Sequence, residues 1–243
     1  MSQLSSGSGS SSVAVAPHRA LEMAGIATFF CLEVWLAGRV LTLAHTGLQL
    51  WLVAAAVLVG YVGADFASGV IHWLFDRYGS VTTPVFGSNF ITPFREHHVD
   101  PKGITRHDFV ETNGNNCIAT APILGAALFL PMASSDVALF AAAALGSLCL
   151  FVFATNQFHK WSHLDNPPAY VQLLQDAHLV LGRAHHDVHH TKPYDRYYCI
   201  TTGWLNPLLT WIGFFPKVEA VIFALTGVRG GDDDARTVEQ RLG

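Results

Sequence analysis

Histidine is the residue type in this chain with the greatest capacity for chemistry. The 243 residues include 13 histidines, and eleven of them fall between His72 and His190. Residues i and i+4 share one face of a helix, and His159 and His163 have that spacing. The string HHDVHH, which starts at His185, contains two more such pairs. One helical turn can therefore present two or three imidazoles, which are ligands for zinc, copper, iron and nickel.

The number of candidate ligands favours two metal ions. A mononuclear zinc site uses three or four protein ligands, and eleven histidines exceed that requirement. His107 and His178 stand alone in the sequence and could serve beside the metals instead of as ligands. His18 and His45 lie outside the clusters and are expected to be structural. The predicted metal ligands are His72, His97, His98, His107, His159, His163, His178, His185, His186, His189 and His190.

Acidic and amide side chains accompany the histidine clusters. Such groups either bind the metal themselves or accept a hydrogen bond from a ligating imidazole, which sets the tautomer and orientation of its ring. The spacing leaves both roles open at each position. The predicted neighbours of the metals are Asp65, Asp76, Glu96, Asp108, Asn156, Asp176 and Asp187.

The composition is that of a membrane protein. Hydrophobic residues make up 51% of the chain and charged residues 13%, whereas a typical soluble domain has roughly 25% charged residues. The mean hydropathy of +0.33 agrees. The net charge of −4 and the lack of a basic cluster argue against nucleic-acid binding. The four cysteines form no CxxC pair, so neither a disulfide framework nor a zinc–thiolate site is expected.

Four apolar segments cover residues 21–43, 48–75, 117–132 and 137–158. A spanning helix needs about 20 mostly apolar residues, and the second and fourth segments meet this requirement easily. The third is short and contains Pro122 and Pro131, so we expect it to form half of a hairpin with the fourth. The sequence predicts an all-α integral membrane protein with about four transmembrane helices.

The distribution of basic residues predicts the topology. The expected outer loops, 45–47 and 133–136, contain no Lys or Arg, whereas the inner segments carry eight such residues between Arg77 and Arg196. This asymmetry follows the positive-inside rule, with Arg39 as the exception. The same topology places the eleven predicted histidine ligands at one membrane face. We therefore expect a His-rich cap on the cytoplasmic face.

The two ends of the chain differ from the apolar middle. Residues 1–20 begin with a Ser/Gly-rich stretch and are expected to form a disordered tail without the basic region of a secretory signal. Residues 229–243 are polar and are expected to form a second tail. Residues 21–228 then make up one membrane-embedded domain. Within it, the 12 residues from Trp204 to Phe215 are too short to span and are expected to lie at the membrane interface.

Several strings resemble the lipid desaturase family that contains the plasmanylethanolamine desaturases, and within it the bacterial CarF-type members. The resemblance covers about residues 61–227, and its last string is the most specific. The strings are DFASGVIHW (65–73), PFREHHVDP (93–101), ITRHDF (104–109), ETNG (111–114), TNQFHKWSH (155–163), LQDAH (174–178), HHDVHH (185–190) and YCITTGWLN (198–206).

This resemblance implies an oxidoreductase with two iron ions. Members of the family convert the 1-O-alkyl chain of plasmanylethanolamine into the vinyl ether of a plasmalogen, with O2 and two electrons. The expected electron donor is a protein of the cytochrome b5 or ferredoxin type, and the expected membrane in a bacterium is the inner membrane. Plant relatives instead desaturate an acyl chain of phosphatidylglycerol. Arg95, Lys102 and Arg106 would contact the lipid phosphate, or would serve only as topology charges.

Three other functions fit the same residues. An enzyme of this metal class could hydroxylate its lipid or desaturate an acyl chain, and product analysis separates these reactions. A zinc-dependent membrane hydrolase would need no O2. A non-enzymatic metal-binding membrane regulator would alter signalling without altering any lipid, but a sensor seldom needs so many ligands.

Overall fold

The computed structural model describes residues 11–84, 87 and 91–231, with side chains from residue 18 onward. Every regular element in these ranges is a helix, which confirms the predicted all-α class. The elements are α1 (Ser11–Leu43), α2 (Gly47–Arg77), α3 (Thr92–Val99), α4 (Gly103–Arg106), α5 (Phe109–Ala127), α6 (Asp136–Ser162), α7 (Ala169–Asp176), α8 (Arg183–Asp187), α9 (Asn206–Trp211) and α10 (Phe214–Thr226).

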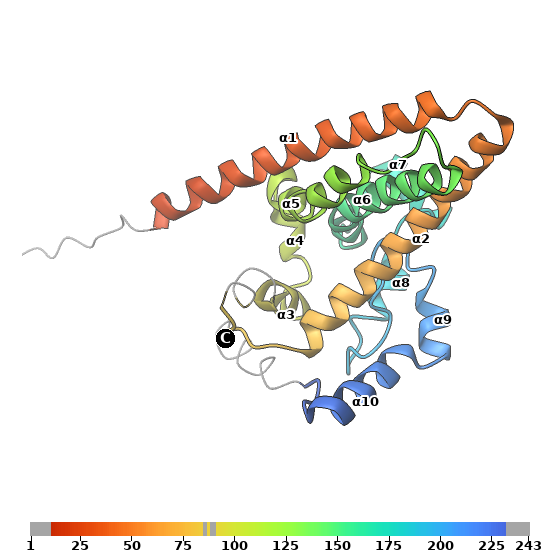
Figure 1. Cartoon of the computed structure of the whole chain (residues 1–243). Helices are drawn as coiled ribbons and strands as arrows, with labels where there is room; N and C mark the ends of the chain where they lie inside the picture. The colour runs from red at the N-terminus through yellow and green to blue at the C-terminus, as the bar shows by residue number, and fades with distance from the viewer. Residues whose placement is uncertain (1–10, 85–86, 88–90, 232–243) are drawn as a thin grey trace, which may run out of the picture.

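The four longest helices form a bundle. In Figure 1, α1, α5 and α6 run side by side, and α2 descends from the end of α1 towards the shorter helices. Helix α2 packs along α6, and α5 contacts both α1 and α6. Their facing apolar side chains form the main core, which includes Phe29 and Leu36 of α1, Ala56 of α2, Leu124 of α5 and Leu139 of α6.

Small residues let α2 and α6 approach closely. A Cβ atom built on Gly60 of α2 would lie 2.6 Å from Ser147 Cβ of α6, which leaves no room for a side chain. The Ser147 hydroxyl donates to the Val57 carbonyl at 2.7 Å, across the same contact. Small side chains and interhelical hydrogen bonds are typical of helix packing inside membranes, where apolar side chains gain little from leaving lipid.

Local sequence signals set the starts of the long helices. Thr46 and Gln49 form a reciprocal capping box at the start of α2. The Ser135 hydroxyl accepts from Ala138 N at the start of α6, and the Asp108 carboxylate accepts from Val110 N and Glu111 N at the start of α5. These caps satisfy backbone donors that would otherwise lack partners at a helix start.

Among the residues that the structure describes, three helices are long and apolar enough to cross a membrane: His18–Leu43, Gly47–Arg77 and Asp136–Ser162. The sequence predicted about four spans. The third predicted segment, 117–132, lies in the later part of α5, a helix of 19 residues that begins in polar sequence and contains Pro122. Helix α5 ends at Ala127, so the apolar run does not continue as one helix, and α5 packs beside the candidate spans in α1 and α6.

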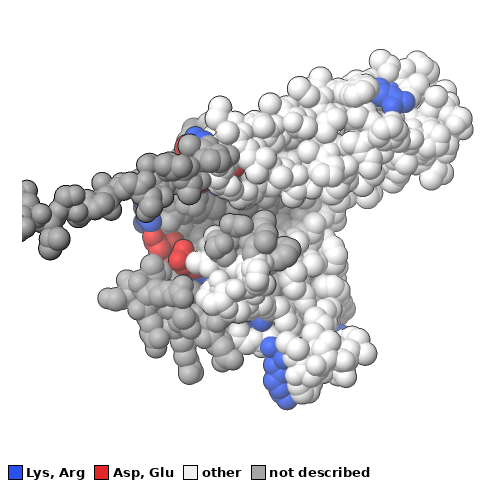
Figure 2. All heavy atoms as spheres, turned by 60° about the vertical axis from the view of Figure 1, so that its left-hand side comes forward, with Lys and Arg blue, Asp and Glu red and all other residues white. Residues whose placement is uncertain are grey.

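The surface of the bundle is suited to lipid. Trp51 of α2 is 77% exposed and Val137 of α6 is 79% exposed, although both side chains are apolar. In Figure 2 the long arm of the molecule is almost wholly white, whereas the coloured Lys, Arg, Asp and Glu atoms gather mainly elsewhere. A large exposed apolar surface of this kind marks contact with a membrane. The chain is therefore an integral membrane protein.

The chain ends depart in part from the predicted tails. Helix α1 begins at Ser11, inside the segment 1–20 that was expected to be disordered, because the small apolar residues from Val13 continue into the first span. Residues 1–10 and 232–243 lie outside the described residues. Gly231 N donates to the Arg77 carbonyl at 3.0 Å, so the start of the expected polar tail is hydrogen-bonded to the end of α2.

A second, smaller core joins the end of α2 to the C-terminal part of the chain. Trp73 of α2 packs with Tyr198, Cys199, Leu209 and Phe215. The predicted interfacial segment, 204–215, forms α9 and the start of α10. Its Trp211 is 84% exposed, which agrees with a position at the membrane interface.

Candidate metal centre

In the described part of the chain, two groups of potential ligands lie where α2 and α6 end. The four-residue group consists of His72, Asp76, His98 and His189, and the five-residue group consists of His97, His159, His163, His186 and His190. Each residue offers one ligand atom, and within each group these atoms lie within 4.8 Å of one another. The structure thus brings eight of the eleven predicted histidines together in two groups. The number of groups equals the two metal ions that the sequence predicted.

The four-residue group is centred on the carboxylate of Asp76. Its Oδ2 lies 3.1 Å from His98 Nε2, 3.4 Å from His72 Nε2 and 3.5 Å from His189 Nε2. His72 and Asp76 are four residues apart on α2, so both point from one helical face. The sequence left open whether Asp76 is a ligand or a neighbour of the metals, and its position makes it a candidate ligand.

The five-residue group is built from imidazoles alone. His159 Nε2 lies 2.9 Å from His186 Nε2 and 3.2 Å from His163 Nε2. His190 Nε2 lies 3.0 Å from His186 Nε2. His159 and His163 come from the end of α6, and His186 and His190 from α8 and the turn after it. Two of the three i, i+4 pairs identified in the sequence, 159/163 and 186/190, therefore converge on one point, whereas the members of the 185/189 pair do not join this group.

Two dipeptides connect the groups. His97 and His98 are consecutive on α3, and His189 and His190 are consecutive after α8. In each pair, one imidazole joins the five-residue group and its neighbour joins the four-residue group. The His72 and His159 rings have centroids 6.0 Å apart, which also places the groups side by side. Two adjacent metal ions are the arrangement that such a pair of groups would hold.

The unsatisfied ring nitrogens fit a metal. Buried polar atoms normally have hydrogen-bond partners, because an unpaired one loses its hydration without compensation. Within the described residues, seven buried atoms of the two groups have no hydrogen-bond partner, and a cation between them would satisfy the nitrogens that face it. They are His72 Nε2, Asp76 Oδ1, His97 Nε2, His98 Nδ1, His186 Nδ1, His189 Nε2 and His190 Nδ1.

Burial keeps the imidazoles outside the membrane spans neutral. Burial, with a smaller effect of Arg183, lowers the pKa of His163 to about 4, and burial, with smaller effects of neighbouring histidines, lowers the pKa of His190 to about 2. The pKa values of His97 and His186 are also well below the usual value, mainly through burial. Neutral imidazole is the form that binds metals. The site therefore presents uncharged nitrogen ligands at neutral pH.

Three predicted ligands lie outside both groups. His107 is exposed and faces Glu111, with Nε2 and Oε1 3.6 Å apart. His178 is exposed and has a positive φ of 56° after α7. His185 Nε2 lies 3.2 Å from Asn206 Nδ2. His185 precedes His186 on the short helix α8, so its side chain points in another direction.

Most of the predicted acidic neighbours also have other roles. Asp108 caps α5 and pairs with Arg19. Asp176 accepts from Gln172 Nε2 at 2.8 Å. Asp187 is exposed and faces Arg183. Glu96 lies half-buried on α3. Asn156 Nδ2 donates to the Thr112 carbonyl at 3.1 Å. Asp65 is buried and accepts hydrogen bonds from the backbone N–H groups of residues 202, 203 and 205.

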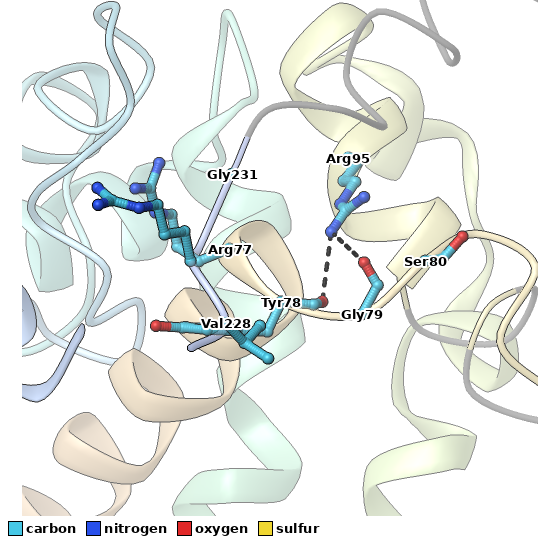
Figure 3. A pocket seen from close by; sticks show the side chains of 8 residues that line it. Arg77, Tyr78, Gly79, Ser80, Arg95, Val228 and Gly231 are labelled. Atoms are coloured by element: carbon cyan, nitrogen blue, oxygen red, sulfur yellow. Dashed lines mark hydrogen bonds between the residues drawn. The ribbon is translucent and has the colours of Figure 1, made fainter. Parts of the chain in front are cut away.

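The three basic residues predicted to contact phosphate are engaged within the protein. Lys102 pairs with Asp165 at 2.6 Å, and Arg106 pairs with Asp100. Arg95 is 6% exposed, and its Nη2 donates to the Tyr78 and Gly79 carbonyls, as the dashed lines in Figure 3 show. This contact borders a hollow of about 260 Å³.

The sequence did not reveal the backbone groups that orient two of the candidate ligands. His72 Nδ1 lies 3.1 Å from the Tyr198 carbonyl, and His189 Nδ1 lies 2.9 Å from the Arg196 carbonyl. Every residue has a backbone carbonyl, so neither residue type nor spacing could show which carbonyls meet His72 and His189. The string YCITTGWLN was recognised as specific, but its contact with α2 appears only in the fold.

The chain matches the lipid desaturase domain over residues 61–233 and belongs to that family. It is an enzyme, an oxidoreductase of the desaturase class. The chain is 53% identical to a plasmanylethanolamine desaturase of Myxococcus xanthus, over 89% of this chain and 76% of the relative. It is 45% identical to plasmanylethanolamine desaturase 1 of Mus musculus, over 78% and 72%.

A plant protein is also similar. The chain is 37% identical to the chloroplastic fatty acid desaturase 4 of Arabidopsis thaliana, over 72% of this chain and 53% of the relative. No solved structure matches the chain significantly. The resemblance found in the sequence is thus confirmed at the level of the family.

Proposed function

We propose that this enzyme converts the 1-O-alkyl chain of plasmanylethanolamine into the vinyl ether of plasmenylethanolamine. The observation that carries the proposal is the pair of adjacent histidine groups in a chain 53% and 45% identical to two plasmanylethanolamine desaturases. Two iron ions bound by these groups would supply the activation of O2 for removing hydrogen from an unactivated alkyl chain.

The reaction balances with one external donor of electrons. One hydrogen leaves each of the two carbons nearest the ether oxygen, and a double bond forms between these carbons. O2 takes up these two hydrogens together with two electrons and two protons and becomes two water molecules. The two electrons must come from a redox protein, for which the cytochrome b5 and ferredoxin types are the candidates.

The protein's own contribution is to hold neutral nitrogen ligands in a buried site that excludes water. His72 and His189 have no exposed surface, and His159 is 6% exposed. The carboxylate of Asp76 gives the four-residue group a negative charge that the five-residue group lacks. The two metals would therefore differ in charge environment, which is one way in which a protein tunes redox chemistry.

The position of the double bond requires that the headgroup be anchored, because the methylenes of an alkyl chain are alike. Lys102 and Arg106 are exposed, and each could exchange its partner carboxylate for a lipid phosphate. Arg95, which precedes His97 by two residues on α3, would contribute from a buried position. The His-rich face would lie in the cytoplasm, at the inner membrane of a bacterium, where a soluble electron donor can reach it.

The test is lipid analysis in a host that makes no plasmalogens. Cells expressing the chain, with an electron donor, receive an alkylglycerol precursor under air, and the extracted lipids are treated with mild acid. Vinyl ethers then release fatty aldehyde, whereas saturated ethers and esters do not. We expect aldehyde from the unchanged chain and none from His189→Ala or without O2. His45→Ala is the matched control, because His45 lies in the exposed turn before α2, and it should keep the activity.

The products decide between this proposal and its rivals. A new double bond in an acyl chain, without aldehyde, would replace the ether substrate by a fatty acyl lipid, the substrate class suggested by the name of the Arabidopsis relative. A hydroxylated lipid would identify a hydroxylase of the same metal class. Zinc in place of iron, with activity that does not require O2, would overturn the oxygenase mechanism and favour a hydrolase. Loss of metal without any change in lipid would favour a membrane regulator.

A further inference from the structure

One loop, residues 196–206, orients two histidines of the four-residue group. Its Arg196 and Tyr198 carbonyls lie 2.9 Å from His189 Nδ1 and 3.1 Å from His72 Nδ1. A carbonyl oxygen can only accept, so each Nδ1 must carry the proton of a neutral ring. Each Nε2 is then left with its lone pair, and both Nε2 atoms face the Asp76 carboxylate. The loop therefore selects the tautomer that can bind a metal between them.

Asp65 ties this loop to the helix that carries His72. Its Oδ1 accepts from Thr202 N and Gly203 N at 2.8 Å each, and its Oδ2 accepts from Leu205 N at 3.1 Å. Asp65 has no exposed surface. Three backbone donors compensate for burying the carboxylate. They also give a reason why an acidic residue occurs inside an apolar span, where it is costly.

Further contacts press the loop against the same face of α2. Ser68, one turn after Asp65, accepts from Ile200 N at 3.0 Å. A Cβ atom on Gly69 would lie 2.5 Å from Cys199 Sγ, so the loop needs a glycine at this position of α2. Asp65, Ser68, Gly69 and His72 therefore contact the loop at successive positions along α2.

Asn206 closes the loop from its other end. Its Oδ1 accepts from Cys199 N and its Nδ2 donates to the Cys199 carbonyl, both at 2.8 Å. Asn206 and Tyr198 are each 1% exposed. The Cys199 N–H that Asn206 binds belongs to the same peptide group as the Tyr198 carbonyl that meets His72, so Asn206 fixes the orientation of that carbonyl.

The five-residue group lacks this arrangement among the described residues. His186 Nδ1 and His190 Nδ1 have no hydrogen-bond partner there, and no carbonyl of loop 196–206 contacts either ring within the described hydrogen bonds. Disturbing the loop should therefore affect the two groups unequally.

We propose that Asp65 and Asn206 are positioning residues that act through loop 196–206 to select the metal-binding tautomers of His72 and His189. Asp65 is not itself a ligand, because its oxygens already accept three backbone hydrogen bonds and it lies outside both groups. This inference rests on metal binding by the proposed centre, but not on the identity of the lipid.

The test is Co2+ binding to the purified full chain in detergent, followed by absorption spectroscopy and by metal analysis. Asp76→Ala and His163→Ala provide reference spectra in which the four-residue and the five-residue group, respectively, are impaired. Asp65→Asn keeps a similar volume and removes the buried charge, so the helix should still insert. Asn206→Asp replaces the donor to the Cys199 carbonyl by an oxygen. Asp165→Asn, at an exposed ion pair, is the matched control.

We expect Asp65→Asn and Asn206→Asp to weaken Co2+ binding at one site by about 10- to 100-fold and to give the Asp76→Ala spectrum. Asp165→Asn should match the unchanged chain. Two unaltered sites in both variants, or equal weakening of both sites, would overturn the selective role and leave the proposed function standing. Failure of the unchanged chain to bind Co2+ or iron would overturn the metal centre and this inference together. If Asp65→Asn does not fold, Asn206→Asp alone decides.

Discussion

At the residue scale, Asp76 is the side chain that distinguishes the two ligand groups. It is the single carboxylate among the nine residues that the described part of the chain brings into them. Its Oδ2 lies within 3.5 Å of the Nε2 atoms of His72, His98 and His189. A negative charge at this point stabilises a cation bound by the three imidazoles.

Replacing Asp76 by Asn should therefore remove one metal and spare the other. The amide keeps the shape of the side chain but loses the charge, and we expect the metal content to fall from about two to about one per chain. Metal analysis of the purified protein after dialysis measures this. Asp187→Asn is the control, because Asp187 adjoins His186 in sequence but is exposed. Retention of two metals by Asp76→Asn would contradict a ligand role for Asp76.

At the element scale, α2 and α6 each serve two purposes. Both are candidate membrane spans, and both place candidate ligands near their C-terminal ends: His72 and Asp76 on α2, and His159 and His163 on α6. The distance between the two sets of ligands depends on how closely the helices cross. Gly60 and Ser147 set that approach within the bundle, well before the ligands along each helix.

Gly60→Leu should separate the two helices. The new side chain would overlap Ser147 and the backbone of α6, and overpacking of this kind costs about 1–3 kcal/mol. We expect a lower Tm in detergent, together with weaker metal binding at both groups. Gly38→Leu on α1 is the control, because nothing lies within 4 Å of a Cβ atom there. An unchanged Tm for Gly60→Leu would show that the α2–α6 contact is looser than described.

At the scale of the whole molecule, an apolar bundle ends in a compact polar region. The bundle keeps its surface apolar for lipid, and the eight grouped histidines are buried or half-buried where residues of α2, α3, α6 and α8 meet. Because these imidazoles are buried in the folded chain and exposed to water in the unfolded chain, the free energy of unfolding depends on pH as well as on metal binding.

The metal-free protein should lose stability as the pH falls. The pKa of His163 is lowered from 6.5 to about 4, mainly by burial and then by the charge of Arg183. Between these values the unfolded chain binds a proton there that the folded chain does not, so stability is greatest above 6.5 and falls with acidification. The loss approaches about 1.4 kcal/mol per pH unit for each such imidazole.

Thermal unfolding of the metal-free protein over this pH range measures the effect. His163→Gln removes one of the titrating groups and should reduce the slope of Tm against pH, although the folded protein loses a buried side chain. A Tm that stays constant on acidification, or an unchanged slope in His163→Gln, would show that these imidazoles are not buried in the neutral form.

The sequence by itself determined the class of this protein. Apolar segments and low charge indicated helices in a membrane, and the spacing of His159 and His163 and of the HHDVHH string indicated a metal site. The helical and membrane predictions are confirmed, because helical period and hydropathy are local properties of the chain, and the histidines of these strings lie close enough together to hold a metal. The family resemblance likewise rested on short strings, and the match over residues 61–233 bears it out.

Only the tertiary structure decided how the candidate ligands divide. It placed His97 and His98 in different groups, favoured a ligand role for Asp76 over a neighbouring one, and left His107, His178 and His185 outside. The sequence could not decide this, because the direction of a side chain depends on how its helix packs against distant segments. The carbonyls of residues 196 and 198 meet His189 and His72 for the same reason: the fold brings together backbone atoms that no sequence pattern distinguishes.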